Sequence, residues 1–317
     1  MLATLGYLAA VAISTVMMCL NVSQMEAVAK LDHYRNFIGV IWATIFFSCG
    51  RILVYQGFIP FFLKQKPGET VKANKCAQQF LNLIFHSLSS AYLCYSLPRR
   101  VWWASDDALW NLNPEVQDYR DITVYILQMG YHTNSLAIHF HEQSGPLRRE
   151  DYKVMLIHHS ATVILISSSF LSNYIRGGLM VLLYHDVSDI FASLVKIVNY
   201  VGWKKSTLVS FTCLVLSWIA TRLFFFPRFI MTTAWSNLYA KPDTTQAVAF
   251  VCMLSLLALH VYWFSLFINM GWIAVTSKGH VQDLSENKVD EEKIKLARTV
   301  GDPNVQSATG KPKPKAN

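Results

Sequence analysis

The sequence predicts an all-α, polytopic membrane protein in which a bundle of transmembrane helices makes up most of the chain. Hydrophobic residues account for 53% of the 317 residues and charged residues for only 15%, whereas soluble domains contain about 25% charged residues. A helix that crosses a bilayer needs about 17 to 25 apolar residues. The chain contains eight apolar runs that are long enough: 3–21, 37–62, 79–97, 122–140, 154–171, 177–199, 207–231 and 247–275.

These runs divide the chain into three parts. Residues 1–36 hold a hydrophobic segment and a loop, residues 37–277 hold the bundle, and residues 278–317 form a polar tail without aromatic residues, a composition typical of disorder. The segment 3–21 carries no charge and so lacks the basic region of a signal peptide. It is either a retained span, which we favour, or an atypical cleaved signal.

The positive charges follow the loops and predict one orientation in the membrane. Because cytosolic loops are enriched in Lys and Arg, the basic clusters and the carboxyl end are expected on the cytosolic side. No basic helix face is interleaved with aromatic residues, so the net charge of +8 does not indicate nucleic-acid binding. The clusters are Lys64, Lys66, Lys72 and Lys75; Arg148, Arg149 and Lys153; Lys196, Lys204 and Lys205; and the tail.

Ionisable side chains stand inside two neighbouring apolar runs, where each one costs about 2.5 to 3.5 kcal/mol on insertion scales. Such groups are rare and normally face a partner or a wet cavity. Spacings of three and four residues place the members of each run on one helix face. The members are His158, His159 and Thr162 in the run 154–171, and His185, Asp186 and Asp189 in the run 177–199.

The topology places these two sets at a similar depth, because the two runs cross the membrane in opposite directions. We therefore expect an antiparallel helix pair that turns His158 and His159 toward Asp186 and Asp189. A carboxylate that holds an imidazole is the arrangement required for general base or nucleophilic catalysis.

Other polar residues of the spans have plainer interpretations. His86, His132 and His260 each indicate a hydrogen bond between helices rather than catalysis. Arg222 has two interpretations: it is the partner of one aspartate, or its side chain reaches toward the membrane interface.

Metal and serine chemistry are both disfavoured by residue spacing. Membrane di-iron oxygenases carry H-x-x-H-H and H-x-x-x-H boxes, and neither His139-Phe140-His141 nor His158-His159 has that spacing. The six cysteines are scattered singly, so they do not suggest a zinc site or a disulfide framework. A G-x-S-x-G motif is missing, which argues against a lipase-type serine. The sequence therefore predicts no metal site.

Several motifs occur together in one order along residues 37–277. Arg149-x-Asp151-x-x-x-Met155-x-x-His158-His159 is followed by Asn173-Tyr174-x-Arg176-x-Gly178 and then by His185-Asp186-x-x-Asp189. With these motifs the chain resembles the ceramide synthase branch of the TLC-domain membrane proteins. That resemblance implies the TLC fold, a six-helix core plus one or two N-terminal spans.

The resemblance also implies an activity: transfer of a fatty acyl group from acyl-CoA to the amine of a sphingoid base, sphinganine or sphingosine. It implies no cofactor beyond acyl-CoA as co-substrate, and a multi-pass location in the endoplasmic reticulum membrane. Lys313 and Lys315 near the carboxyl end resemble a dilysine-type retrieval signal to that compartment, although a basic solubilising tail is the alternative.

Carried over residue by residue, the resemblance gives a candidate site. His158 is the favoured acyl carrier or base, and the loop from Asn237 to Gln246 is implied to influence acyl-chain length. Ser193 replaces a glutamate that many members carry, and the loop after the second span is too short for the homeobox-like domain of many animal members. The catalytic candidates are His158, His159, His185, Asp186 and Asp189, and the substrate-binding candidates are Arg149, Lys153, Thr162, Arg222, Lys204 and Lys205.

The competing class is a non-enzymatic TLC-type protein that handles lipid or assists translocation. Proteins of that class share the fold but lack the combination of a double histidine with the H-D-x-x-D motif. The sequence leaves open the acyl-chain length, the preferred base, and whether the protein works as a homo-dimer, as a hetero-dimer or with an accessory subunit.

Overall fold

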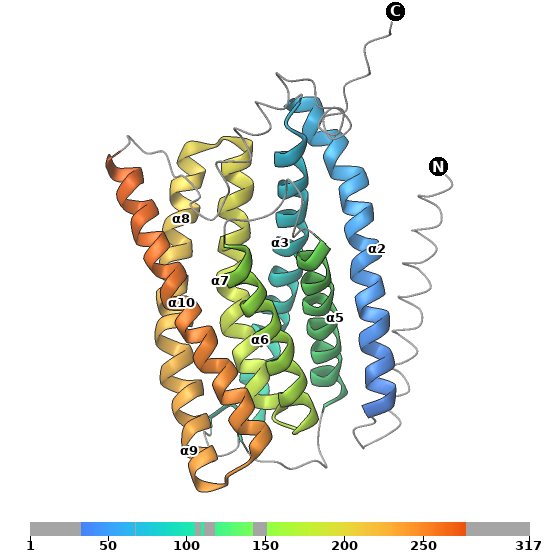
Figure 1. The fold of residues 1–317 in the computed structure, drawn as a ribbon, viewed down its shortest axis with the longest axis vertical. Coiled ribbons are helices and arrows are strands. Elements are labelled where there is room, and N and C mark those ends of the chain that lie inside the picture. Colours follow the sequence, from blue (N-terminus) through green and yellow to red (C-terminus); the bar gives the residue numbers. More distant parts are fainter. Residues whose placement is uncertain (1–32, 67, 105–108, 111–117, 142–150, 277–317) are drawn as a thin grey trace, which may run out of the picture.

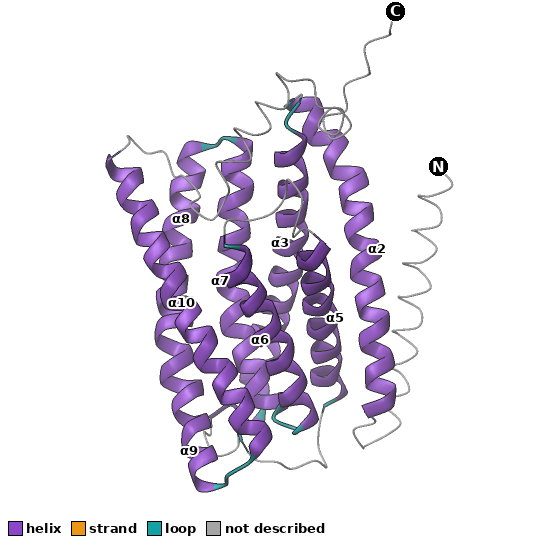
Figure 2. Ribbon diagram, in the orientation of Figure 1, coloured by secondary structure: helices purple, strands orange, loops and turns teal. Residues whose placement is uncertain are grey.

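A computed structural model describes residues 33–66, 68–104, 109–110, 118–141 and 151–276. Every regular element within these ranges is a helix (Figure 2). The segment 3–21, Arg149 and the tail lie outside the described residues, so the predictions made for them stay predictions.

The described helices coincide with the apolar runs from 37–62 onward, which confirms the predicted all-α bundle. The helix α8 continues without a break through a π-helical stretch, η4, into α9. Two short 3₁₀ turns, η1 (Leu97–Arg99) and η2 (Val101–Ala104), follow α3. The longer elements are α2 (His33–Gln65), α3 (Thr70–Ser96), α5 (Tyr119–His141), α6 (Tyr152–Leu171), α7 (Ile175–Val201), α8 (Lys204–Trp218), η4 (Ile219–Met231), α9 (Thr232–Ala240) and α10 (Thr244–Thr276).

Five of these described segments are long and apolar enough to cross a membrane by length and composition: α2, α6, α7, α8 to α9, and α10. The helices α3 and α5, which contain the predicted spans 79–97 and 122–140, do not meet that criterion. Both carry polar residues along one side, among them Gln79, Asn82 and His86 of α3. These residues face the interior of the bundle, as described below, so the two helices place their polar side away from lipid.

Successive helices run in opposite directions, so α2 ends where α3 begins and α7 ends where α8 begins (Figure 1). We call this end of the bundle the basic end, because the described members of the lysine clusters lie at it: Lys64, Lys66, Lys72, Lys75, Lys196, Lys204 and Lys205. That placement agrees with the charge pattern of the loops. The loop from Asn237 to Gln246 lies at the opposite end, where α9 ends and α10 begins.

The helix α7 lies between α3 and α8, while α6 packs mainly against α10 and α5 (Figure 1). Short turns join α6 to α7 and α7 to α8. Asn173, in the turn between α6 and α7, has a φ of 60°, a conformation that asparagine tolerates better than most residues. Gly202 ends α7 with a φ of 91° and donates its N–H to the carbonyls of Val198 and Asn199. The sequence neighbours α6 and α7 are thus not each other's main packing partners.

The apolar core fills the half of the bundle remote from the basic end. Leu93 of α3, Leu179 of α7 and Leu256 of α10 are almost fully buried there in one continuous cluster. Two smaller clusters, around Trp218 and around Phe62, support the basic half. The space between these clusters holds the polar side chains of the bundle.

An ion-pair clamp at the remote end is expected to stabilise the fold. Arg100 binds Asp118, and its Nη2 lies 2.6 Å from Asp121 Oδ1. Replacing Arg100 with glutamine is expected to cost about 1 to 3 kcal/mol of unfolding free energy, because two partly buried carboxylates lose a charged partner. The midpoint of thermal unfolding in detergent measures this loss. A midpoint equal to that of the wild type would contradict it.

The same clamp predicts a dependence on pH. Burial tends to raise the pKa of Asp118, but the hydrogen bonds from Arg100 outweigh it and hold this pKa below its usual value. The stabilisation is therefore fully present above the unfolded-state pKa of about 3.9 and is lost as the pH falls through the lower folded value. The R100Q variant should lose less stability than the wild type over this acidic range.

Candidate active site

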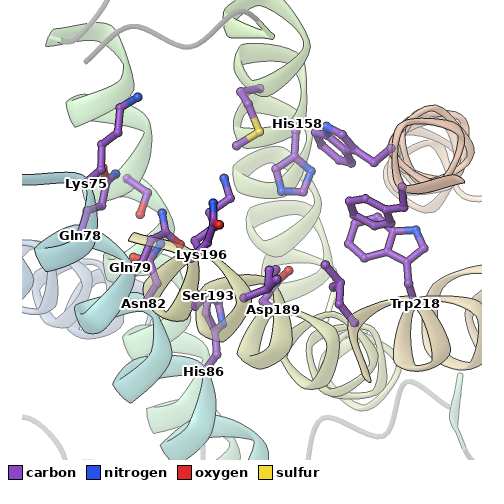
Figure 3. A pocket seen from close by; sticks show the side chains of 18 of the residues that line it. Lys75, Gln78, Gln79, Asn82, His86, His158, Asp189, Ser193, Lys196 and Trp218 are labelled. Carbon is purple, nitrogen blue, oxygen red and sulfur yellow. The ribbon is translucent and has the colours of Figure 1, made fainter. Parts of the chain in front are cut away.

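Six helical segments surround a cavity of about 260 Å³ in the basic half of the bundle (Figure 3). Lys75 and Lys196 line it near the basic end, and His86, His158, Asp189 and Arg222 line it deeper in the bundle. A second, narrow cavity of about 30 Å³ shares His132, His158 and Asp189 with the first. It continues into the apolar half between Leu165, Leu182 and Tyr125. The two cavities together form a chamber with His158 at its middle, and polar and apolar side chains line both parts of it.

His158 of α6 borders both cavities and is positioned by aromatic packing. Its ring meets the indole of Trp263 edge-on, with 5.2 Å between the centroids. That indole donates its Nε1–H to Asp151 Oδ2 over 3.3 Å, which ties the N-terminal turn of α6 to α10. His158 Nδ1 is buried and makes no hydrogen bond to any described residue. The ring is therefore held by contacts that leave Nδ1 without a hydrogen-bond partner among the described residues.

His159 lines the larger cavity beside His158, with 5.5 Å between the two ring centroids. Its other aromatic neighbour is His139 of α5, also at 5.5 Å. His139 stacks on Tyr152 and contacts the carbonyl of that residue through Nε2 over 2.9 Å. His139 thus packs beside the double histidine and supports it. The sequence did not predict this contact.

His185 of α7 lines the narrow cavity. Its Nδ1–H donates to the carbonyl of Val181 over 2.7 Å, which leaves Nε2 as the nitrogen with a lone pair. The ring lies 4.9 Å from that of His260, measured between centroids. His185 and His158 therefore meet at the narrow cavity from opposite helices.

Arg222 of η4 is the partner of Asp189, which decides between the two interpretations of this arginine. Its side chain is 1% exposed, and its Nη2 lies 2.6 Å from Asp189 Oδ1. The same guanidinium donates to Ser188 Oγ at 2.6 Å and to the His185 carbonyl at 3.0 Å, and it contacts His260 Nε2 at 3.2 Å. All three guanidinium nitrogens of Arg222 therefore contact protein groups, and the side chain does not extend toward the membrane interface. A substrate-binding role for Arg222 stays a prediction.

The backbone around Arg222 is unusual, because η4 is wider than an α-helix. Pro227 lies inside it and cannot donate a backbone hydrogen bond. π-helical segments occur frequently at functional sites. Here the wide turns bring Arg222 into the polar centre of the bundle.

Asp186 lines the narrow cavity together with His158, but its hydrogen bonds go to α3 and α5 rather than to the α6 histidines. Its carboxylate lies 2.8 Å from His86 Nδ1 and accepts hydrogen bonds from Ser89 and Gln128, each over 2.6 Å. With 3.6 residues per turn, side chains three residues apart diverge by about 60° around a helix. Because α7 lies between α3 and α8, Asp186 turns to α3 and α5 while Asp189 turns to η4.

The remaining predicted residues occupy separate places. Thr162 lines the narrow cavity, and its hydroxyl donates to the His158 carbonyl over 2.8 Å. Lys153 is exposed in the first turn of α6, and Lys204 and Lys205 are exposed at the basic end. Lys75 and Lys196, which the sequence marked only as orientation signals, line the larger cavity itself.

Within the described residues, His, Cys, Asp and Glu side chains form no group of three or more that could hold a metal ion. The side chains that the chamber offers for chemistry include imidazole, carboxylate and guanidinium groups.

Comparison with known proteins places this arrangement in a wider group. The model of the TLC domain matches residues 75–269, a range that begins in α3 and ends in α10. ASC1-like protein 3 of Oryza sativa subsp. japonica is 26% identical over 271 residues, which cover 78% of this chain and 94% of the relative. Ceramide synthase LOH2 of Arabidopsis thaliana is 26% identical over 70% of this chain and 77% of the relative. Ceramide synthase 3 of Mus musculus is 30% identical over 63% of this chain, but the match spans only 51% of the mouse protein.

Proposed function

The chain belongs to the TLC-domain family, and from this premise we infer that it is a ceramide synthase, an acyl-CoA-dependent N-acyltransferase of sphingoid bases. Several relatives that match over 63 to 73% of the chain carry the name ceramide synthase. The observation that carries the proposal is the position of His158. It stands where the larger cavity, which reaches toward the basic end, meets a narrow one that continues between leucine side chains.

Each part of the substrates finds a matching surface in the chamber. The fatty acyl chain is apolar, and Leu165, Leu182 and Leu256 of the narrow cavity would contact the part of it next to the carbonyl. CoA carries phosphates, and lysines occur along the larger cavity and around the basic end. The thioester carbonyl, which joins the two parts, would then lie beside His158.

Two routes from this position give the same products. In the first, an imidazole nitrogen of His158 attacks the thioester carbonyl, CoA leaves as its thiol, and the base amine then displaces the imidazole. In the second, His158 removes a proton from the amine, which attacks the thioester directly, and the proton passes to the leaving thiolate. Both routes form one amide bond and break one thioester bond, and both use a positioned imidazole.

The pair of the buried Arg222 with the partly exposed Asp189 positions the opposite wall of the chamber. Arg222 holds the His185 carbonyl and Ser188 in place, so the stretch of α7 that faces the narrow cavity is fixed. A fixed wall matters because a displacement of about 1 Å in the reacting groups can cost about 10²-fold in rate.

The orientation in the membrane follows from the same proposal. Acyl-CoA is made available in the cytosol, and the positive-inside rule assigns the basic end to that side. The carboxyl terminus then also lies in the cytosol, since α10 ends at the basic end. Residence in the endoplasmic reticulum membrane, which the family resemblance implies, is part of the same proposal.

Neutralising the exposed lysines at the basic end is expected to weaken acyl-CoA binding. In a K204A/K205A variant the KM for acyl-CoA should rise about 2- to 30-fold, because each exposed charge contact contributes about 0.2 to 1 kcal/mol. The kcat should change little, and the effect should shrink as ionic strength increases. Steady-state kinetics at two salt concentrations measure both quantities. Lys241→Ala, at the opposite end of the bundle, is the matched control, and an equal rise in that variant would contradict the assignment.

The activity itself is tested in membranes that contain the chain. A panel of acyl-CoAs of different lengths is supplied with sphinganine, and the lipid products are identified by mass spectrometry against membranes without the chain. Dihydroceramides of defined acyl length are the expected products. Binding of sphinganine without any product across the panel would instead support the lipid-handling alternative.

A further inference from the structure

A second histidine faces the chamber from the wall opposite His158 (Figure 3). His86 of α3 is 5% exposed and lines the larger cavity. Its Nδ1 lies 2.8 Å from Asp186 Oδ1, and Asp186 is itself only 1% exposed. The result is a buried carboxylate–imidazole pair beside the cavity that the proposed function assigns to the substrates.

The carboxylate of this pair is fully supported on its other side. Asp186 Oδ2 accepts hydrogen bonds from Ser89 Oγ and Gln128 Nε2, each over 2.6 Å, and Gln128 also donates to Ser89 over 2.8 Å. A carboxylate that accepts several hydrogen bonds is stabilised in its charged form. Because an ionised carboxylate can only accept hydrogen bonds, His86 Nδ1 is the donor in its contact with Asp186.

The surroundings of the second ring nitrogen of His86, Nε2, can stabilise a proton on it. His86 Nε2 lies 3.4 Å from the hydroxyl of Tyr131, and that hydroxyl donates its own hydrogen to Asn82 Oδ1 over 2.9 Å. The Tyr131 oxygen is thus free to accept from an Nε2–H. Both N–H groups of a protonated His86 therefore have acceptors, and the charge of Asp186 compensates that of the ring. Tyr131 and Asn82 line the cavity together with His86.

The proposed reaction needs such a group. The amine of a sphingoid base is an ordinary aliphatic amine, which like lysine is an ammonium below a pKa of about 10.4 and cannot attack a carbonyl in that form. In the overall reaction an ammonium and a thioester give an amide, a thiol and one released proton. His158 and the departing thiolate account for the proton that passes to sulfur, and the released proton needs a separate acceptor.

Resting on the proposed function, we propose that His86, held by Asp186, accepts the proton that the substrate ammonium loses before its nitrogen attacks the acyl carbonyl. The nitrogen lone pair freed in this step forms the new C–N bond, and the proton leaves His86 for water at the basic end after the product departs. The purely structural alternative is that the cluster only ties α3 and α5 to α7. That role requires hydrogen bonds, but it does not require a group that titrates.

The test is the pH profile of ceramide formation by the full chain with His86→Gln. Glutamine keeps a donor for Asp186 but cannot accept a proton. At about pH 7 the variant should be about 10² to 10⁴-fold slower than the wild type. The deficit should shrink by about 100-fold toward about pH 9, where a larger share of the amine loses its proton without help.

Other charged or titratable groups face this cluster and contribute to any profile: Asp186, Asp189 and His185 on α7, Tyr131 and His132 on α5, and Arg222 on η4. A matched control therefore keeps all of them. Ser89→Ala removes a hydrogen bond to Asp186 without removing a titrating group, so any loss in this variant should be the same at both pH values. Asp186→Asn is the second variant, and its deficit should also shrink at high pH.

The outcomes separate this proposal from the proposed function. If the wild type makes ceramide and H86Q keeps near-full activity at about pH 7, the role assigned to His86 is wrong while the proposed function stands. A loss that stays constant across the pH range in both H86Q and Asp186→Asn would show a structural role and would equally overturn the proposal. A wild type that makes no ceramide at any pH would overturn both.

Discussion

Replacing His158 with alanine is expected to abolish most of the ceramide-forming activity while leaving the bundle folded. The reduction in kcat should be at least about 10² to 10⁴-fold, the usual contribution of a positioned acid–base or nucleophilic group. The fold should survive because the ring nitrogen Nδ1 makes no hydrogen bond to any described residue, and the substitution mainly removes the packing of the ring against Trp263. Steady-state kinetics of the purified variant, together with its thermal midpoint, measure both effects.

His141→Gln is the matched control for this substitution. His141 lies at the end of α5, is exposed, and lines neither of the two cavities that His158 borders. Its replacement should leave kcat within about twofold of the wild type, as expected for a surface change away from special features. Near-full activity of H158A, or an equal loss in both variants, would remove His158 from the reaction.

Replacing Arg222 with methionine is expected to have the largest effect on stability. The substitution leaves Asp189 without its partner at 2.6 Å and removes the contacts to Ser188, the His185 carbonyl and His260. Removing one member of a fully buried pair typically costs about 3 to 5 kcal/mol, and since the Asp189 side chain is 29% exposed the loss should lie toward the lower limit. Activity should fall as well, because the His185 carbonyl and Ser188 lose the group that holds them.

A double variant distinguishes this pair from a general packing defect. In D189N/R222M neither charge remains, so the double variant should be more stable than R222M alone. Arg228→Met is the matched control, since Arg228 lies in the same helix, η4, but is exposed. Thermal midpoints in one detergent compare the four proteins. An R228M variant as unstable as R222M, or no recovery in the double variant, would contradict the account.

The helices were predictable because each apolar run is long and its ends are marked by charged or turn-forming residues. The run 177–199 became α7, which begins at Ile175 after the Asn173 turn and ends at Val201 before Gly202. The grouping of His158 with Asp189 around one cavity was also predictable. It depends only on the direction of each span and on the depth of each residue, and both follow from counting along the chain.

The partners of Asp186 could not be predicted in the same way. Spacing along one helix fixes which side chains share a face, but it does not say which helix that face meets. The opposite directions of the two runs suggested that α6 and α7 form an antiparallel pair, whereas α7 packs mainly against α3 and α8. His86 and Gln128 therefore meet Asp186 from positions 100 and 58 residues away in the chain.

The lysines show a related limit. A loop lysine carries the same orientation signal whether it faces water or a cavity, so the sequence treated Lys75 and Lys196 as topology markers alone. The structure places both on the wall of the larger cavity. Arg222 had two interpretations for a similar reason, and only the position of η4 relative to α7 decided that it pairs with Asp189.

The most direct test of the central claim is the stoichiometry of the reaction catalysed by the purified chain in lipid nanodiscs. One acyl-CoA and sphinganine are supplied, and dihydroceramide and free CoA are both quantified over time. The account predicts that the two products appear in equal amounts with the wild type and that neither appears above background with H158A. Release of CoA without dihydroceramide would indicate a thioesterase, and the absence of both from the folded wild type would contradict the assignment of this chamber to N-acyl transfer.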